Sequence, residues 1–459
     1  MGKLNWRVLV PLFLIFCLFV YLRFYDLGHR AEFGWDQDQF SNQIVKLVED
    51  HQPSLLGPRV NNDNGFFLAP YFTYILVPFY LLTGLHPVGM FLFQFFANTG
   101  FFFLAFFVIS KLFSHRHALF FLFLWTISYI LMDLETITWW PILIPPGVML
   151  LWFLQEKIYK NPKDFKLWIL TGVISGLFIN MHFQFIFTLI QFGFFALLLK
   201  TKKIQTTITN IAIFLTYFVL MFIPLFIFDL RNNFLNTKLF FNYFFIKNSI
   251  QSAQYFDWPL VFSLALNPYL IVKTPFAGIV TMVGLFCATF YLYRKSSGFK
   301  SLFYLTNSIM ILITPVAFSL IGMRPSEYYF LYLMPIFLLV LIDLFLITKL
   351  SQILLGLCIL LAVFNYPNLK LTLEPNYGSL QYKDDLVKYI KSQVGNKKFF
   401  ISFDGPPGSD GGFRYLIKIH KLNSSPDGRN PQIQVKSPSL DGKLTYGIYG
   451  VIIPEELKR

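Results

Sequence analysis

Long apolar runs, separated by short polar or basic segments, constrain the fold of this chain more than any other feature. Several of them reach the roughly 20 residues that an α-helix needs to cross a bilayer. The runs are residues 7–25, 66–83, 88–112, 117–132, 138–155, 167–181, 183–199, 208–228, 275–293, 301–321, 328–347 and 351–366. The chain is 55% hydrophobic and only 14% charged, whereas globular proteins carry roughly 25% charged residues. The sequence therefore predicts an α-helical polytopic membrane protein.

The net charge of +14 does not indicate nucleic-acid binding, because the basic residues fall in short clusters between the apolar runs. That pattern is typical of the cytoplasmic loops of membrane proteins. The three cysteines, Cys17, Cys287 and Cys358, all lie inside apolar runs. We interpret them as small buried apolar side chains, and they imply neither a disulfide nor a zinc site.

The basic clusters also predict the topology. If every run crossed the membrane, the clusters would change sides midway along the chain, against the positive-inside bias. Omitting the run at 66–83 places all clusters on the side of the N-terminus, and Pro70 and Pro78 interrupt helical hydrogen bonding in that run. We expect about 11 transmembrane helices and a helix at 66–83 that lies along the outer face or dips into it. The N-terminus would be cytoplasmic and the C-terminus extracytoplasmic.

This topology divides the chain into two domains. Residues 1–366 form the membrane domain, and residues 26–87 are its long first outer loop. An amphipathic pattern over 36–50 predicts a surface helix within that loop. Residues 367–459 are polar and rich in Gly, Pro, Ser and Lys, and they predict a small α+β domain outside the membrane.

Local signals within the C-terminal domain are consistent with an α+β fold. Apolar residues at helical spacing predict a short helix over 386–394 that ends at Gly395. Strand-like runs follow at 398–403 and 446–453. The segment 405–412 (GPPGSDGG) is too rich in turn formers to be other than a loop, and no GK[ST] follows it as a phosphate loop requires.

An acidic stretch opens the surface helix of the first outer loop. Asp36 and Asp38 lie in its first turn, where carboxylates complement the helix dipole. Carboxylates at a membrane boundary are costly and are commonly kept for chemistry. Partial burial beside Trp35 would raise the pKa of a carboxylate toward that of a useful general base. Asp36 and Asp38 are therefore the catalytic candidates; the simpler interpretation is a helix cap and a solvated side chain.

Three more residues are candidates for binding the acceptor or a metal. Asp133 and Glu135 belong to the second outer loop, and His182 lies at a hairpin tip. Carboxylates from two separate loops can hold a divalent cation, or one of them can orient the acceptor. Ordinary solvation of a helix end and a satisfied interfacial histidine are the alternatives. No cofactor motif is present, so a divalent cation is the one cofactor candidate, and its identity is unknown.

Three arginines are candidates for binding a lipid phosphate. Arg59, Arg231 and Arg324 are expected on the outer face, although positive charge is generally depleted there. A guanidinium recognises phosphate through two parallel hydrogen bonds, which suits this role. Arg231 has an alternative partner in Asp229, with which it could form a local ion pair.

Several short motifs, in their order and spacing, resemble a known family. They are residues 34–38 (GWDQD), 56–58 (LGP), 68–74 (LAPYFTY), 133–135 (DLE), 139–145 (WWPILIP), 180–187 (NMHFQFIF) and 228–231 (FDLR). Together they resemble the C-type membrane glycosyltransferases of the GT-C fold. More narrowly, the chain is similar to the bacterial relatives of protein O-mannosyltransferases and to the aminoarabinose lipid A transferase. The resemblance covers roughly residues 5–350.

The resemblance implies transfer of a sugar from a polyprenyl-phosphate donor to an acceptor on the outer face, with inversion at the sugar. Asp36 would be the general base, and the partners would be the lipid-linked donor and membrane lipids. The chain departs from the family at Gln37, which stands where a glutamate is expected. Either Asp38 takes over the role of that glutamate or the role is dispensable.

Two other classes of function compete with this interpretation. A multi-pass transporter or lipid flippase would place charges deep within its spans. Most charges here lie at the ends of runs, and Asp343, the clearest exception, lies toward the inner end of its run. A non-catalytic scaffold would have no use for acids on two separate outer loops.

Overall fold

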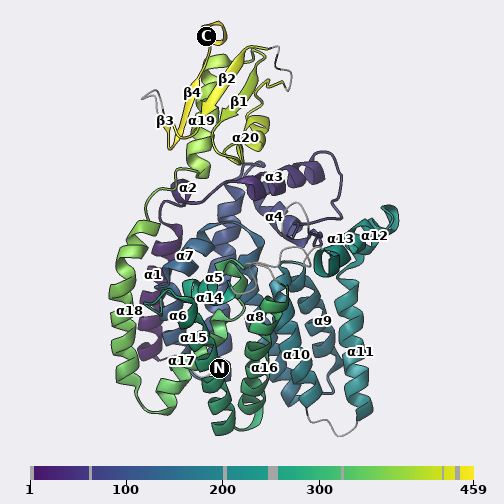
Figure 1. Cartoon of the computed structure of the whole chain (residues 1–459), viewed down its shortest axis with the longest axis vertical. Coiled ribbons are helices and arrows are strands. Elements are labelled where there is room, and N and C mark those ends of the chain that lie inside the picture. Colours follow the sequence, from purple (N-terminus) through teal and green to yellow (C-terminus); the bar gives the residue numbers. More distant parts are fainter. Residues whose placement is uncertain are drawn as a thin grey trace.

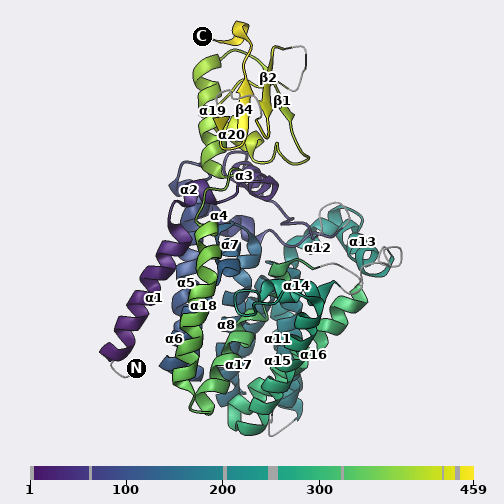
Figure 2. The same cartoon turned by 60° about the vertical axis from the view of Figure 1, so that its left-hand side comes forward.

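The computed structural model shows a bundle of helices with a small domain of helices and strands beyond one end (Figure 1). The structure describes residues 5–60, 65–199, 204–246, 257–321, 325–425, 428, 430–439 and 445–458. The N-terminal helix starts toward the end of the bundle that lies away from this domain (Figures 1 and 2). We call the end of the bundle beneath the C-terminal domain the capped end.

The bundle contains several helices that can span a membrane. Among the described residues, five are long and apolar enough by length and composition. They are α1 (Trp6–Phe24), α5 (Gly89–Leu112), α15 (Pro275–Lys295), α16 (Gly298–Ile321) and α18 (Ser351–Thr372). Two bent pairs raise the number to seven if each pair is one span. The pairs are α6 (His115–Thr126) with α7 (Tyr129–Thr136), bent by 71°, and α11 (Ile204–Leu220) with α12 (Ile223–Arg231), bent by 55°. The chain is a multi-pass membrane protein.

Shorter helices complete the bundle. They are α8 (Ile144–Lys160), α9 (Phe165–Ile179), α10 (Ile186–Leu198) and α17 (Met334–Ile347). With 13 to 17 residues each, they are about 20–26 Å long. Helix α17 lies in the core, since every side chain from Met334 to Val340 is buried. The expected number of 11 spans counts all four of these shorter helices as spans. Because length and composition alone identify only five to seven spanning helices among the described residues, the number 11 stays a prediction.

Short helices gather at the capped end. Helix α3 (Trp35–Val48) forms in the first loop where the amphipathic pattern predicts it, and it buries Phe40, Ile44 and Val45. Helix α4 (Tyr71–Leu82) has 12 residues and is about 18 Å long, too short for a hydrocarbon core of roughly 30 Å. The other short elements are α2 (Leu27–Arg30), η1 (Trp140–Leu143), η2 (Phe183–Phe185), α13 (Leu235–Phe241), η3 (Asn242–Ile246), α14 (Trp258–Ala265) and η5 (Glu327–Phe330).

The C-terminal domain is a small mixed sheet with two helices. The sheet has the strand order β1-β2-β4-β3, with β1 and β2 parallel and the other pairs antiparallel. Its elements are α19 (Leu380–Val394), β1 (Phe400–Asp404), α20 (Phe413–Ile419), β2 (Gln432–Lys436), β3 (Thr445–Tyr446), β4 (Tyr449–Ile452) and η6 (Glu455–Leu457). The predicted helix, its glycine end and both strand-like runs are present, and β2 is an additional strand. Helix α18 continues to Thr372, past the boundary expected at residue 366.

The C-terminal domain is fixed to the first outer loop by buried hydrogen bonds. The ammonium of Lys383 donates to the carbonyl oxygens of Phe33 (2.7 Å) and Gly411 (2.8 Å). Burial lowers the pKa of Lys383 to about 8. The hydroxyl of Tyr415 donates to the carbonyl of Leu85 at 2.5 Å. These contacts bring the domain onto the segment that carries Asp36.

Candidate functional site

Asp36 lies in the first turn of α3, at the capped end. The preceding residue Gly34 is extended and allows the chain to turn into the helix, and its backbone N–H donates to Oε1 of Gln37 at 2.9 Å. The side chain of Asp36 is half-buried. Burial, together with the nearby charge of Glu32, raises the pKa of Asp36 to about 6. A carboxylate with this pKa is suited to accept a proton near neutral pH.

Gln37 connects the start of α3 to the second outer loop. Its Nε2 donates to the carbonyl of Thr138 at 3.0 Å, and the hydroxyl of Thr138 donates to Oε1 of Gln94 on α5 at 3.0 Å. A glutamate has no N–H donor and could not make the bond to Thr138 when ionised. The departure at Gln37 therefore has a local structural reason, because the amide both caps α3 and joins the two loops.

Asp38 faces the C-terminal domain. It is buried, and its Oδ1 accepts the backbone N–H of Tyr415 at 2.8 Å. This bond attaches α20 to α3, so the carboxylate is already committed to a structural contact. This contact favours Asp36 over Asp38 as the base, and the catalytic role of Asp38 stays a prediction.

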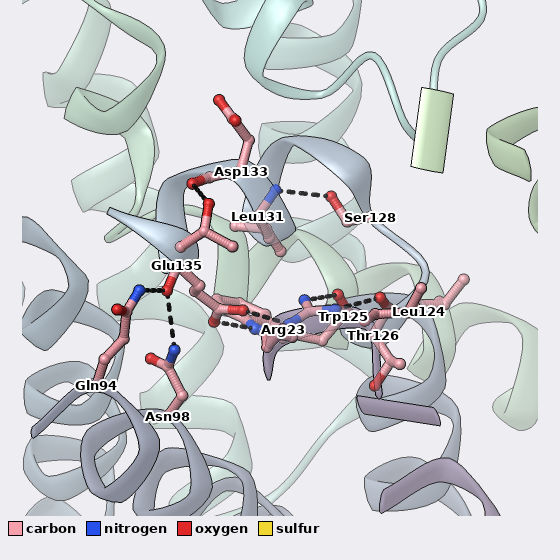
Figure 3. A network of polar contacts seen from close by, with 12 residues as sticks. Arg23, Gln94, Asn98, Leu124, Trp125, Thr126, Ser128, Leu131, Asp133 and Glu135 are labelled. Atoms are coloured by element: carbon pink, nitrogen blue, oxygen red, sulfur yellow. Dashed lines mark hydrogen bonds and ion pairs between the residues drawn. The ribbon is translucent and has the colours of Figure 1, made fainter. Parts of the chain in front are cut away.

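The second outer loop separates its two acids, although they are two residues apart. Asp133 is exposed, and its carboxylate points away from the polar network below it (Figure 3). Glu135 is buried, and its Oε2 accepts from Nε of Arg23 at 2.8 Å. A buried carboxylate already paired with a guanidinium is less available to an acceptor or a metal. The structure thus gives Glu135 packing partners, and its role as an acceptor or metal ligand stays a prediction.

Arg23 lies at the centre of that buried network (Figure 3). It is fully buried and also donates to the carbonyls of Thr126 (2.6 Å) and Trp125 (3.0 Å), where α6 gives way to α7. The indole N–H of Trp125 donates to Oε1 of Glu135 at 2.7 Å. These bonds satisfy backbone groups left open by the helix break. The sequence analysis missed Arg23, although an arginine inside an apolar run is itself a signal.

Asp36 and Asp133 share an electrostatic neighbour. Glu32 interacts electrostatically with both carboxylates, and Glu327, the first residue of η5, interacts with Asp133. Arg30 is close enough to offset part of the charge at Asp133. We call Glu32, Asp36, Asp133 and Glu327 the acidic site. It joins the first outer loop, the second outer loop and the segment before α17.

Aromatic side chains and His182 form a wall beside the acidic site. Tyr328 interacts electrostatically with Asp36, and its ring lies 4.6 Å from that of Trp139 and 5.5 Å from that of His182. Burial lowers the pKa of His182 to about 3, and its Nδ1 accepts the backbone N–H of Gln184. His182 is therefore a neutral ring in this wall, and its role as an acceptor or metal ligand stays a prediction.

The three arginine candidates have different outcomes. Arg59 is half-buried, donates from Nε to the carbonyl of Gly65 at 3.0 Å and stacks on Phe67. Arg231 is exposed at the end of α12. The carboxylate of Asp229 accepts instead from the backbone of the segment that follows α12. Arg324 lies outside the described residues. Of the three arginines, Arg59 is the one that belongs to the first outer loop, which also carries Asp36.

A cavity of about 200 Å³ lies against the aromatic wall. His182 and Tyr329 line it on the side of the wall, and the remaining lining is mainly apolar, with Phe187 and Phe318. The side-chain amide of Gln184 also lines the cavity, and among the described residues neither its nitrogen nor its oxygen has a hydrogen-bond partner. A second, mainly apolar cavity of about 210 Å³ adjoins it at Phe183. A buried amide without a partner is costly unless a ligand or water satisfies it.

Comparisons with solved structures relate this arrangement to known enzymes. ArnT from Cupriavidus metallidurans in the apo state has a TM-score of 0.56 at 14% identity, over 94% of this chain and 93% of that one. The same protein bound to undecaprenyl phosphate gives 0.56 at 11% identity, with the same shares covered. The oligosaccharyltransferase AglB from Archaeoglobus fulgidus, in complex with an inhibitory peptide and a dolichol-phosphate, gives 0.51 at 10% identity, over 98% of this chain and 74% of that one.

The chain has the GT-C fold. The match extends over most of its length and includes the C-terminal domain, whose composition alone could only indicate an α+β unit. By sequence, neither a family model nor a curated protein matches the chain. The GT-C fold expected from the short motifs is confirmed. Sequence identities of 10–14% establish the fold and do not by themselves establish the activity.

Proposed function

We propose that this protein is an inverting glycosyltransferase that moves a sugar from a polyprenyl-phosphate donor to an acceptor at the capped end. The observation that carries the proposal is Asp36, a half-buried carboxylate with its pKa raised to about 6. It belongs to the acidic site and interacts electrostatically with Tyr328 of the aromatic wall, which borders an apolar cavity. The GT-C fold supports the same conclusion, since two matched proteins were solved with a polyprenyl phosphate bound.

The chemistry needs one base and a stabilised leaving group. Asp36 accepts the proton of the acceptor hydroxyl or amine as that group attacks the anomeric carbon. The bond from this carbon to the phosphate oxygen breaks on the opposite face, so the polyprenyl phosphate leaves and the configuration inverts. Such a single displacement requires no covalent enzyme intermediate. Arg59 is our candidate for stabilising the phosphate charge, with Arg231 and Arg324 as further candidates.

The donor lipid would enter from the membrane. Its polyprenyl chain is apolar and fits the cavities beside the aromatic wall, while a polar group near its head would satisfy the amide of Gln184. Asp133 and the other carboxylates of the acidic site would orient the acceptor or hold a hard divalent cation, which prefers oxygen ligands. We place the capped end on the extracytoplasmic side, as the basic clusters require.

Transport is less well supported than catalysis. The charged groups inside the bundle are engaged with each other, as in the pair of Arg23 and Glu135. Asp343 likewise accepts from Tyr304 and lies 2.8 Å from Nε2 of His117. These groups make satisfied packing contacts, whereas a transport path needs sites that a substrate or ion can enter.

The proposal predicts a pH profile. We expect kcat/KM to rise about tenfold per pH unit up to about pH 6 and then level off, because only the ionised form of Asp36 accepts a proton. Glu32→Gln removes the neighbouring negative charge and should move this inflection to lower pH. Initial rates of donor cleavage between pH 4.5 and 8 measure both effects. A flat profile across pH 6 would contradict the assignment of Asp36.

The bond between the two outer loops predicts a second effect. Gln37→Glu removes the donor to Thr138 and should lower kcat by about 10–100-fold, since small displacements of a catalytic group have effects of this size. Gln39→Glu, an exposed change on the same helix, is the matched control and should leave kcat unchanged. Steady-state kinetics of both variants give the comparison. Equal kcat values would show that the link between the loops is dispensable.

A further inference from the structure

Two histidines and an aspartate meet where the C-terminal domain contacts the membrane domain. His86 comes from the loop between α4 and α5, Asp384 from α19, and His420 from the residue after α20. Nε2 of His420 lies 2.6 Å from Oδ1 of Asp384, and Nε2 of His86 lies 3.4 Å from the same oxygen. One potential ligand atom from each residue lies within 4.8 Å of the other two. Three segments distant in sequence thus present nitrogen and oxygen ligands to one point.

The backbone around His86 is arranged to hold this residue in place. Gly84 and Leu85 both have positive φ, +62° and +67°, a conformation that is uncommon for leucine. The hydroxyl of Thr83 donates to the carbonyl of His86 at 2.8 Å, and the carbonyl of Leu85 accepts from Tyr415. One hydrogen bond within the loop and one from α20 therefore hold the loop in place, so that His86 lies opposite α19.

The two carboxylate oxygens of Asp384 have different partners: Oδ1 faces the histidines and Oδ2 pairs with a lysine. It is 3% exposed, and its Oδ2 lies 2.6 Å from the ammonium of Lys388, one turn further along α19. The side chains of His86 and His420 are 28% and 20% exposed. Of the three potential ligands, the carboxylate is thus buried, while the two imidazoles are partly exposed and leave the site accessible from solvent.

Two imidazoles and one carboxylate are a ligand set that suits Zn²⁺, with water in the fourth position. Hard cations such as Mg²⁺ prefer oxygen ligands and suit it poorly. Without metal, Nδ1 of His86 accepts the N–H of Val88 at 3.2 Å, so Nε2 carries the proton and can donate to Asp384. Zinc would displace the Nε2 protons of both histidines, as imidazole ligation requires. A neutral His86 that binds zinc through Nε2 carries its proton on Nδ1, so Nδ1 could no longer accept the N–H of Val88. That hydrogen bond is long and exposed, so its loss costs little.

We propose that His86, Asp384 and His420 bind one Zn²⁺ ion that fastens the C-terminal domain to the membrane domain. The attachment would act next to the acidic site, because α20 is also bonded to α3 through Tyr415 and Asp38. The three ligands come from both domains, so binding requires the domains to be in contact. This proposal does not depend on glycosyl transfer and is tested by binding alone.

The test uses the full-length protein in detergent, freed of any affinity tag and of metal by chelation and dialysis. Titration with Zn²⁺ should give one site per chain, and Co²⁺ at that site should show the visible absorption of a four-coordinate ion. His86→Ala and His420→Ala should each weaken Zn²⁺ binding by at least about tenfold. His51→Ala, which alters an exposed histidine of the same outer loop, is the matched control and should bind as the wild type does.

A conservative variant separates a metal site from a hydrogen-bonded contact. Glutamine at position 420 places its amide N–H near the position of the histidine Nε2 and can still donate to Asp384, but it is a poor zinc ligand. His420→Gln should therefore lose Zn²⁺ binding while its metal-free melting temperature stays near that of the wild type. Zn²⁺ should raise the melting temperature of the wild type and not that of this variant, and equimolar Mg²⁺ should raise neither. The proposal is overturned if the wild type binds no stoichiometric Zn²⁺, or if His86→Ala and His420→Gln bind it as tightly as the wild type.

Discussion

We expect Asp36→Asn to lower the rate of sugar transfer by about 10²–10⁴-fold, the usual contribution of a general base. Asparagine has nearly the same shape as aspartate and is tolerated in the first turn of a helix, so the variant should fold. The side chain would still reach the acceptor but could not take its proton. The measurement is the initial rate of polyprenyl-phosphate release by purified protein at pH 7.5, at saturating donor.

Asp50→Asn is the matched control for this experiment. Asp50 is an exposed acid just beyond α3, and its change removes the same charge without touching the site. It should retain the wild-type rate. If Asp36→Asn also retained that rate, Asp36 would not be the base, and another carboxylate of the acidic site would have to be tested in its place.

The largest effect on stability is expected at Glu135. Glu135→Ala leaves the guanidinium of Arg23 buried without its carboxylate, and breaking a buried pair in this way costs about 3–5 kcal/mol. It also removes the acceptor of the Trp125 indole. Thermal unfolding in detergent should show a large decrease in melting temperature. Asp133→Asn, two residues away and exposed, should change stability by less than about 0.5 kcal/mol.

A double variant shows how the destabilisation arises. Arg23→Met with Glu135→Met removes both charges, so it should be more stable than Glu135→Ala alone, because no uncompensated charge remains. If the single and double variants unfolded at the same temperature, the ion pair would not be the cause. A melting temperature of Glu135→Ala equal to that of the wild type would contradict the assignment of this network to packing.

Patterns of apolar residues were enough to predict the class of protein and much of its local structure. The surface helix over 36–50 and the helix ended by Gly395 follow from spacing and end signals that belong to one segment. The strand β2 was missed because Gln432–Lys436 carries polar residues at three of its five positions and has no apolar flanks. Its place between β1 and β4 comes from pairing with strands elsewhere in the chain.

Pairings between distant residues could not be predicted in the same way. Arg23 and Glu135 are separated by 112 positions, and no periodicity connects them. The sequence predicts a loop at Asp133 and Glu135, whereas both lie in helix α7. Residues two apart face nearly opposite sides of a helix, so Asp133 points outward and Glu135 inward. Likewise, Asp36 and Asp38 look alike in the sequence, and only the fold shows that Asp38 accepts the backbone N–H of Tyr415, 377 positions away.

Donor cleavage in sealed proteoliposomes tests the central claim most directly. The protein is reconstituted with a polyprenyl-phosphate sugar and an envelope extract as a source of acceptors, and lipid products are followed by mass spectrometry. Our account predicts that free polyprenyl phosphate accumulates with the wild type and not with Asp36→Asn. Movement of the intact donor across the bilayer without release of polyprenyl phosphate would contradict it and would favour a flippase.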